Sequence, residues 1–190
     1  MKTKKSRLIR GMTMIETITA SAVGVLVIFT SVMAMISGMG TWAKGQSKIN
    51  ADLQSQRAIR AIAINLREAM SVTVDNDGNG LTYRLPKFDG SGNIISPIQW
   101  DNIERRIVRQ DGKILIGPSG SLRTLTTDVI TTDPLTNGSP SYTLFVSDGA
   151  TVVRRLNVMV ATKTISSNNQ TVTSRVRETI YLRNVPILSK

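Results

Sequence analysis

The residues Arg10-Gly11-Met12-Thr13-Met14-Ile15-Glu16 begin the stretch that decides the fold. Five basic residues accompany them (Lys2, Lys4, Lys5, Arg7 and Arg10), and the 27 residues 17–43 that follow carry no charge. This run exceeds the roughly 20 residues that a helix needs to cross a bilayer. Because the cations precede the run, the positive-inside rule predicts a cytoplasmic N-terminus and places the rest of the chain beyond the membrane.

Glu16 is the unusual residue of this stretch, since it is the one acid at the start of an apolar segment. An unpaired carboxylate at the bilayer centre costs about 2.5–3.5 kcal/mol. We therefore expect Glu16 to be uncompensated or protonated until a cation meets it. An ordinary secretory signal is cleaved after its apolar core, and only Ser37-Gly38-Met39-Gly40 offers such a place here. The uncharged run is too long for that kind of core, which favours another class of signal.

The order of basic leader, glycine, glutamate and apolar run resembles the class III signal of type IV pilins and type II secretion pseudopilins. The resemblance implies that a prepilin peptidase cleaves between Gly11 and Met12 and that Met12 becomes N-methylated. It also implies that Glu16 acts in assembly by pairing with the amino terminus of a neighbouring subunit. The implied partners are other major and minor pilins, an assembly ATPase and a polytopic platform protein.

A long helix is expected to follow, because no proline occurs between Met1 and Leu85. Beyond the uncharged run, apolar residues recur at helical spacing: Ile49, Leu53, Ile59, Ile62, Leu66 and Met70. One helix is therefore predicted from about Thr13 to Met70, with Gly24 and the segment 38–45 as its weak points. The predicted organisation is a leader (1–11), a transmembrane and assembly helix (12–43), an amphipathic helix (44–72) and a β-rich head (73–190).

The head is predicted to be an antiparallel sheet on the apolar face of the helix, which gives an α+β, pilin-like fold. The predicted strands are Ser71–Val74, Leu81–Leu85, Ile94–Trp100, Ile103–Arg109, Lys113–Ile116, Leu122–Ile130, Tyr142–Val146, Val152–Thr162 and Thr171–Arg183. Asp-Gly pairs in 110–113 and 147–150 predict two hairpin turns.

Composition argues against an enzyme. The chain contains neither histidine nor cysteine, so Ser-His-Asp and Cys-His catalysis and the usual zinc sites are excluded. The exported part can form no disulfide for the same reason. Function is therefore expected in assembly or binding.

One loop could hold calcium. Asp75, Asp77 and Asn79 stand at alternate positions before Gly80, as in the first half of an EF-hand loop. The carboxylate that should complete such a loop falls on Pro86. Because Asp, Asn and Gly also form turns without a metal, a plain turn is the simpler interpretation.

The head is basic, with 19 Lys and Arg against 12 Asp and Glu from Lys44 onward. Such a surface suits nucleic acid or an acidic partner, although aromatic residues are sparse for base stacking. The segments 61–69 and 174–184 resemble minor pilins of the W type and pseudopilins of the J type. The expected function is a minor pilin or pseudopilin of the inner membrane, with a periplasmic or extracellular head. This resemblance implies a subunit that primes assembly or lies near the tip of a type IV pilus or type II secretion pseudopilus. Two alternatives remain: a minor pilin that binds DNA for uptake, and a membrane-tethered β domain that does not polymerise.

Overall fold

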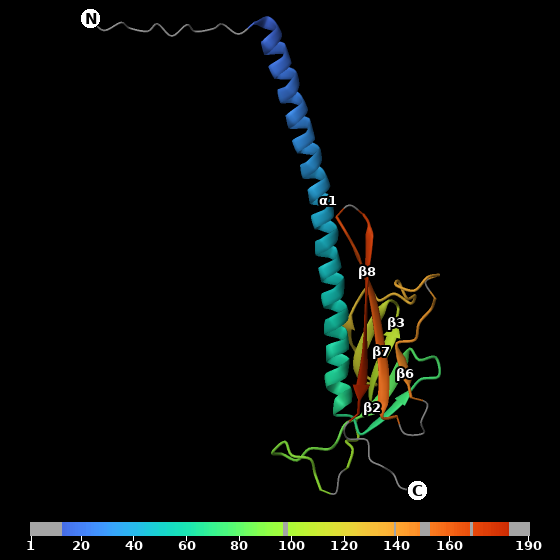
Figure 1. Cartoon of the computed structure of the whole chain (residues 1–190). Helices are drawn as coiled ribbons and strands as arrows, with labels where there is room; N and C mark the ends of the chain where they lie inside the picture. Colours follow the sequence, from blue (N-terminus) through green and yellow to red (C-terminus); the bar gives the residue numbers. More distant parts are fainter. Residues whose placement is uncertain (1–12, 97–98, 139, 149–152, 168, 183–190) are drawn as a thin grey trace, which may run out of the picture. The chain divides into compact units, whose positions relative to one another are not determined.

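The computed structural model describes residues 13–96, 99–138, 140–148, 153–167 and 169–182 (Figure 1). A single long helix, α1 (Met14–Arg67), comes first and the strands follow it. Within the described residues these are β1 (Ser71–Val74), β2 (Gly80–Arg84), β3 (Arg105–Gln110), β4 (Lys113–Pro118), β5 (Arg123–Thr126), β6 (Phe145–Ser147), β7 (Arg155–Ile165) and β8 (Thr171–Tyr181). One helix followed by antiparallel strands confirms the predicted α+β class.

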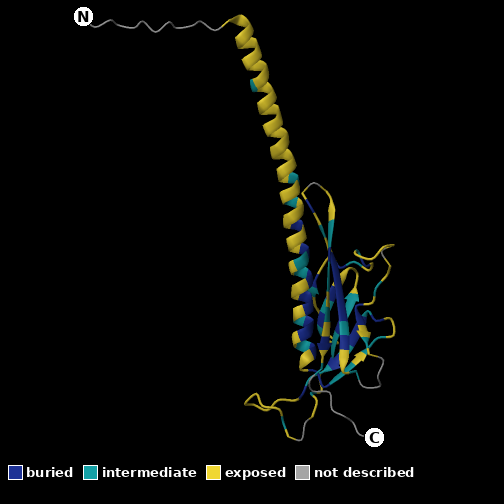
Figure 2. Ribbon diagram, in the orientation of Figure 1, coloured by how far each residue is buried: buried dark blue, intermediate teal, exposed yellow. Residues whose placement is uncertain are grey.

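The chain divides into two compact units, Met1–Trp42 and Ala43–Lys190, which we describe separately. In the first unit, the large apolar side chains of α1 are exposed (Figure 2). Its hydroxyl groups bond to carbonyls three or four residues earlier in the helix, at Thr17, Thr19, Ser21, Thr30, Ser31 and Thr41. A bilayer core offers no water to such groups, so internal partners suit them to lipid. The prediction of a helix long and apolar enough to cross a membrane is confirmed.

The second unit contains two antiparallel sheets. One has the strand order β1-β2-β3-β4-β5 and the other the order β6-β7-β8. The hairpin between β3 and β4 turns at Asp111 (φ 50°) and Gly112 (φ 69°), as the Asp-Gly pair predicts. β7 and β8 form the longest pairing, with eleven residue pairs from Arg155↔Tyr181 to Ile165↔Thr171.

The core of the head lies between the last turns of α1 and both sheets. Ile59, Ile62 and Leu66 are almost fully buried, as predicted, at 2%, 0% and 0% exposure. They belong to one cluster with Ile107 of β3 and Val158 of β7, so both sheets contribute to the same core. Helix and sheets together bury one continuous apolar surface, which is the main stabilising contribution expected for the head.

The predicted apolar stripe of the helix is wrong in its first part, at Ile49 and Leu53. Ile49 and Leu53 are 55% and 42% exposed, whereas Ser47, Ala51 and Ser55 are buried in their place. The stripe that contacts the sheets therefore begins with small residues and becomes apolar only further along the helix. Small side chains let α1 approach β7 closely enough for hydrogen bonds to form between them.

Several other predicted elements differ in extent; for example, β6 begins at Phe145 and β7 ends at Ile165. α1 ends at Arg67, three residues before Met70, because the Met70 amide donates to the Arg84 carbonyl and so joins the sheet. No described residue of 94–100 lies in a strand; only isolated bridges join Pro86 to Trp100 and Phe88 to Ile94. Proline has no amide to donate, so Pro86 ends the ladder that β2 begins. The segment 122–130 forms only the short β5, since Asp128 adopts a positive φ of 58°.

Candidate functional site

The first described residues of α1 form a reciprocal hydrogen-bonded cap. The Thr13 amide donates to Glu16 Oε2 at 3.1 Å, and the Thr13 hydroxyl donates to the same oxygen at 3.2 Å. In return, the Glu16 amide donates to Thr13 Oγ1 at 3.3 Å. This arrangement is the capping box, in which an N-cap threonine and a glutamate three residues later satisfy each other's free amides.

The cap gives Glu16 partners within its own chain, because Thr13 supplies two hydrogen-bond donors to its carboxylate. These donors carry no charge, so the expected pairing of Glu16 with a cation stays a prediction. The positive end of the helix dipole also favours a negative charge at this position. The sequence signal for this was the spacing Thr13-x-x-Glu16, which our sequence analysis did not use. The predicted processing residues, Gly11 and Met12, lie outside the described residues, as does the leader.

The predicted calcium loop forms the turn between β1 and β2. The Gly78 amide donates to the Asp75 carbonyl at 2.8 Å, and the Asp75 amide donates to the Gly80 carbonyl at 2.9 Å. Asp77 accepts bonds from the backbone amide and the side-chain amide of Asn79, which hold the pKa of Asp77 below its usual value. Local hydrogen bonds of this kind make a turn without any ion.

Two arginines of β3 bind the same turn. Arg106 Nη2 lies 2.6 Å from Asp75 Oδ2, and Arg109 donates to the side-chain oxygen of Asn79. Asp75 and Asn79 thus have protein partners. Among the described residues, no three Asp or Glu side chains come together as a metal-binding group. Calcium binding by Asp75, Asp77 and Asn79 remains an untested prediction.

The same turn connects the two sheets. Gly78 has φ 64°, and a Cβ at this position would lie 2.8 Å from Thr143 Cβ and 2.9 Å from the Phe145 carbonyl oxygen. The Phe145 amide in turn donates to the Gly78 carbonyl at 2.9 Å. Only glycine fits both the positive φ and this close approach. The Arg109 guanidinium adds a second connection, since it lies 4.8 Å from the centre of the Tyr142 ring.

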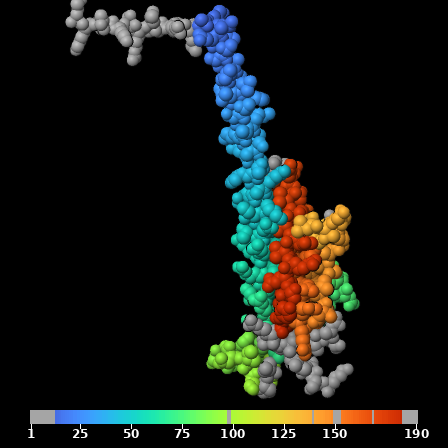
Figure 3. Space-filling model, viewed as in Figure 1, coloured from blue at the N-terminus to red at the C-terminus, as the bar shows by residue number. Residues whose placement is uncertain are grey.

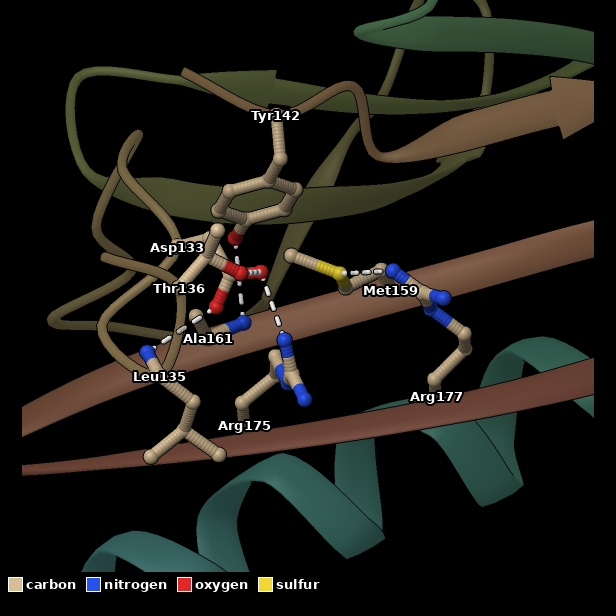
Figure 4. A network of polar contacts seen from close by, with 8 residues as sticks. All are labelled: Asp133, Leu135, Thr136, Tyr142, Met159, Ala161, Arg175 and Arg177. Carbon is tan, nitrogen blue, oxygen red and sulfur yellow. Dashed lines mark hydrogen bonds and ion pairs between the residues drawn. The ribbon is translucent and has the colours of Figure 1, made fainter. Parts of the chain in front are cut away.

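An ion pair that sequence reasoning did not find joins the buried Asp133 to the half-buried Arg175 of β8, beside β7 (Figure 4). Asp133 Oδ2 accepts from Arg175 Nη1 at 2.5 Å and from the Thr136 hydroxyl at 2.7 Å, and Oδ1 accepts from the Leu135 amide at 3.1 Å. The bond from Thr136, followed by those from Leu135 and Arg175, holds the pKa of Asp133 below its usual value. Asp133 and Arg175 are 42 residues apart, so no local spacing indicates this pair.

Tyr142 closes this cluster from above in Figure 4. Its hydroxyl oxygen accepts a bond from the Ala161 amide of β7 at 3.0 Å, and burial raises its pKa. Together, Asp133 and Tyr142 fix the loop between β5 and β6 against the β7–β8 hairpin. Its bonds join a loop to two strands that are distant in the sequence, so the cluster positions these strands.

The upper contact between α1 and the hairpin is polar. Ser55 Oγ and Thr162 Oγ1 lie 2.8 Å apart, and Thr162 also donates to the Ala51 carbonyl at 3.0 Å. Lys48 Nζ donates to the Thr173 carbonyl at 2.8 Å, and Ser174 donates to Asp52. These bonds satisfy the hydroxyls that the close approach of helix and strands removes from water.

Comparisons of the chain with protein-family models, with curated proteins and with solved structures found no match.

Proposed function

We propose that this chain is a minor pilin or pseudopilin, a structural subunit that waits in the inner membrane and then joins a filament through α1. The observation that carries the proposal is the character of the first unit. Its apolar side chains are exposed along the helix, and Glu16, at the beginning of that helix, is its one charged described residue. An apolar helix with one acid suits two environments, lipid before assembly and neighbouring helices after it.

In this proposal, assembly exchanges the partners of Glu16. In the single chain its carboxylate accepts from Thr13. In the filament it would accept from the amino terminus of Met12 of a neighbouring subunit, a charged donor in a medium of low dielectric constant. The exposed Ile49, Leu53 and Ile64 support further subunit contacts, because in the single chain these side chains have no apolar cover.

Mass spectrometry of the membrane-extracted protein tests maturation. We expect a chain that begins at N-methylated Met12, because the basic leader and the spacing from Gly11 to Glu16 resemble the class III signal. A bulky residue at Gly11 should leave the leader attached. A mature end near Gly38, or an uncleaved Met1, would contradict the proposal and favour a membrane-tethered domain.

A matched pair of variants separates the charge of Glu16 from its capping role. Glu16→Gln keeps an oxygen that can complete the capping box but removes the charge. Thr13→Ala removes the N-cap hydroxyl and keeps the charge, and should loosen the first turn by about 0.5–2 kcal/mol. We expect filaments to be lost in the first variant and kept in the second.

The copy number of the subunit in filaments tests whether it is a minor pilin. Quantitative proteomics of sheared filaments should find this subunit scarce, and its deletion should reduce filament number. A subunit that dominates the filaments would be the major pilin. Normal filaments containing Glu16→Gln at wild-type levels would show that the charge is not needed for assembly.

A further inference from the structure

β8 is a long strand with one unpaired edge. It lies at the end of the sheet β6-β7-β8 and pairs with β7 over all eleven of its residues. At about 3.3 Å per residue, this edge extends for roughly 36 Å. In Figure 3 the red atoms of this part of the chain form a continuous band at the surface.

The ladder shows which backbone groups point away from β7. The Met159 and Lys163 amides donate to Leu144 and Asp128, so the odd-numbered residues of β7 bond on the side away from β8. Even-numbered residues of β7 must therefore bond to β8, and their partners are the even-numbered residues of β8, as in the pair Thr162↔Ser174. The odd-numbered residues of β8 point their amides and carbonyls outward.

Lys48 marks this outward direction and limits the open part of the edge. Its ammonium group bonds the Thr173 carbonyl at 2.8 Å, which agrees with an outward direction of that carbonyl. Among the described residues, no backbone partner occupies the outward groups of Arg175, Arg177 and Thr179. Arg67 of α1 contacts this stretch only through the side chain of Glu178, whose backbone pairs with Val158 of β7. The backbone groups of three consecutive outward positions are therefore left for a further strand.

The edge keeps one of the features that discourage strand pairing, its charged side chains, which are Arg175, Arg177 and Glu178. Natural edges are also blunted by shortness, proline or a bulge. β8 contains neither proline nor glycine, its register with β7 is unbroken, and Thr, Val and Ile make up six of its eleven residues. A long, regular edge of this kind can template pairing with another chain whose charges match it.

Charge indicates which partner it is. Arg177 is exposed, and its one described hydrogen bond is to the Met159 sulfur at 3.3 Å (Figure 4). No described carboxylate forms an ion pair with Arg177, whereas Arg175 has Asp133. An added strand places side chains directly opposite Arg175 and Arg177, and opposite charges in such pairs are stabilising.

Charge also makes a second copy of β8 a poor partner for this edge. Full-length antiparallel pairing of two copies would centre on Val176, the middle residue of Thr171–Tyr181. Arg175 of each copy would then lie opposite Arg177 of the other, and like charges in directly opposed pairs are destabilising.

We propose that the outer edge of β8, from Arg175 to Thr179, accepts an extended acidic segment of another protein as an additional β-strand. Backbone hydrogen bonds would hold the segment, and acidic side chains at alternate positions would face the arginines. Apolar side chains between the acids would lie beside the half-buried Val176. The site does not depend on α1 assembly or on Glu16.

A labelled peptide, Ser-Thr-Val-Glu-Val-Glu-Val-Thr-Ser, is the probe, and the same peptide with lysine in place of glutamate is its control. Binding to the full chain in lipid nanodiscs is followed by fluorescence anisotropy at low and high salt. Arg177→Glu should weaken the acidic peptide roughly tenfold at low salt and improve the lysine peptide. Thr179→Pro removes an outward amide without touching the ladder to β7, and should weaken both peptides several-fold.

Arg155→Glu is a matched control, since it changes an exposed charge on β7 rather than on the edge. Single-stranded DNA of similar charge is a further probe. Two results would overturn the proposal: failure of the acidic peptide to bind at millimolar concentration, or binding that Arg177→Glu leaves unchanged. A third result would also overturn the proposal: the peptide and the DNA both bind, and both respond to Arg177→Glu but not to Thr179→Pro. Charge alone would then explain the attraction. Circular dichroism confirms folding. If the proline variant misfolds, an acidic peptide with N-methylated backbone amides replaces it, since it keeps the charge and cannot form the ladder; equal binding of this peptide would overturn the proposal.

Discussion

The two halves of the contact between α1 and the sheets are built differently. From Ala58 to Leu66 the buried side chains are apolar and belong to the core shared by both sheets. From Ser47 to Ser55 they are small, and the contact with β7 and β8 consists largely of hydrogen bonds. Apolar burial contributes about 1.5–3 kcal/mol for each large side chain, whereas a hydrogen bond contributes about 0.5–1.5 kcal/mol net. The apolar half therefore holds the head together, and the polar half sets the distance and register of helix and hairpin.

The largest effect is expected in the apolar half. Leu66→Ala should destabilise the head by about 2–5 kcal/mol, because it leaves a cavity at a fully buried position. Hydrogen exchange of the β7 amides in the full chain measures the loss. Ile64→Ala is the matched control, since Ile64 is 57% exposed and its truncation leaves no cavity. Equal effects of the two variants would mean that the apolar half is not the main source of stability.

An intermediate effect is expected in the polar half. Ser55→Leu forces a large side chain between α1 and Thr162 and should cost about 1–3 kcal/mol by overpacking. Exchange should rise near Thr162 and remain slow near Val158, if the two halves open separately. Gln56→Leu adds the same side chain at an exposed position and should change the exchange rate neither near Thr162 nor near Val158. Ser55→Ala should cost only about 1 kcal/mol, because Thr162 keeps its bond to the Ala51 carbonyl.

The smallest effect is expected from a change of pH. It should be found in the part of the β7–β8 hairpin that Asp133 contacts. The pKa of Asp133 is lower in the folded chain than that of an ordinary aspartate, so the ionised form stabilises the fold. That contribution is complete about one pH unit above the pKa of an unfolded aspartate and is lost as pH falls through the lower folded value. Local exchange near Ala161 and Arg175 should therefore rise in acid. Asp133→Asn should make this region weaker at neutral pH and less sensitive to acid; an unchanged acid response would assign it to other carboxylates, such as Asp77 or Asp89.

These residues show how far the sequence could predict the fold. Ile59, Ile62 and Leu66 follow helical spacing and are correctly placed in the core. Ile49 and Leu53 have good spacing with each other but lie on another face of the helix, and Ser47, Ala51 and Ser55 continue the true stripe. Hydrophobicity alone cannot identify a stripe in which small polar residues are buried, because their burial depends on hydroxyl partners in strands over 100 residues away.

Some features of the candidate sites could be predicted from the sequence and others could not. The β1–β2 turn could be predicted, because Asp, Asn and Gly specify their own local bonds at Asp75, Asp77 and Asn79. The ion pair of Asp133 and Arg175 could not, because it forms between a loop and a distant strand. The cap of Glu16 by Thr13 was readable from the sequence, as the spacing is that of a capping box. Nothing local in β8 reveals that it is an edge, since strand order is a property of the whole sheet.

The internal bonds of the hydroxyl groups in the first unit have a consequence for lateral alignment. Four hydroxyl groups donate their protons within their own helix, at Thr19, Ser21, Thr30 and Ser31. They are therefore not available as donors to adjoining helices, and the contact between helices is mainly apolar. Such surfaces pack almost equally well when one helix slides along another by a turn, about 5.4 Å. In any bundle of this helix, axial position would then depend mainly on Glu16. Loss of its charge should appear as heterogeneity of axial spacing as well as loss of material, which diffraction from oriented assemblies would detect.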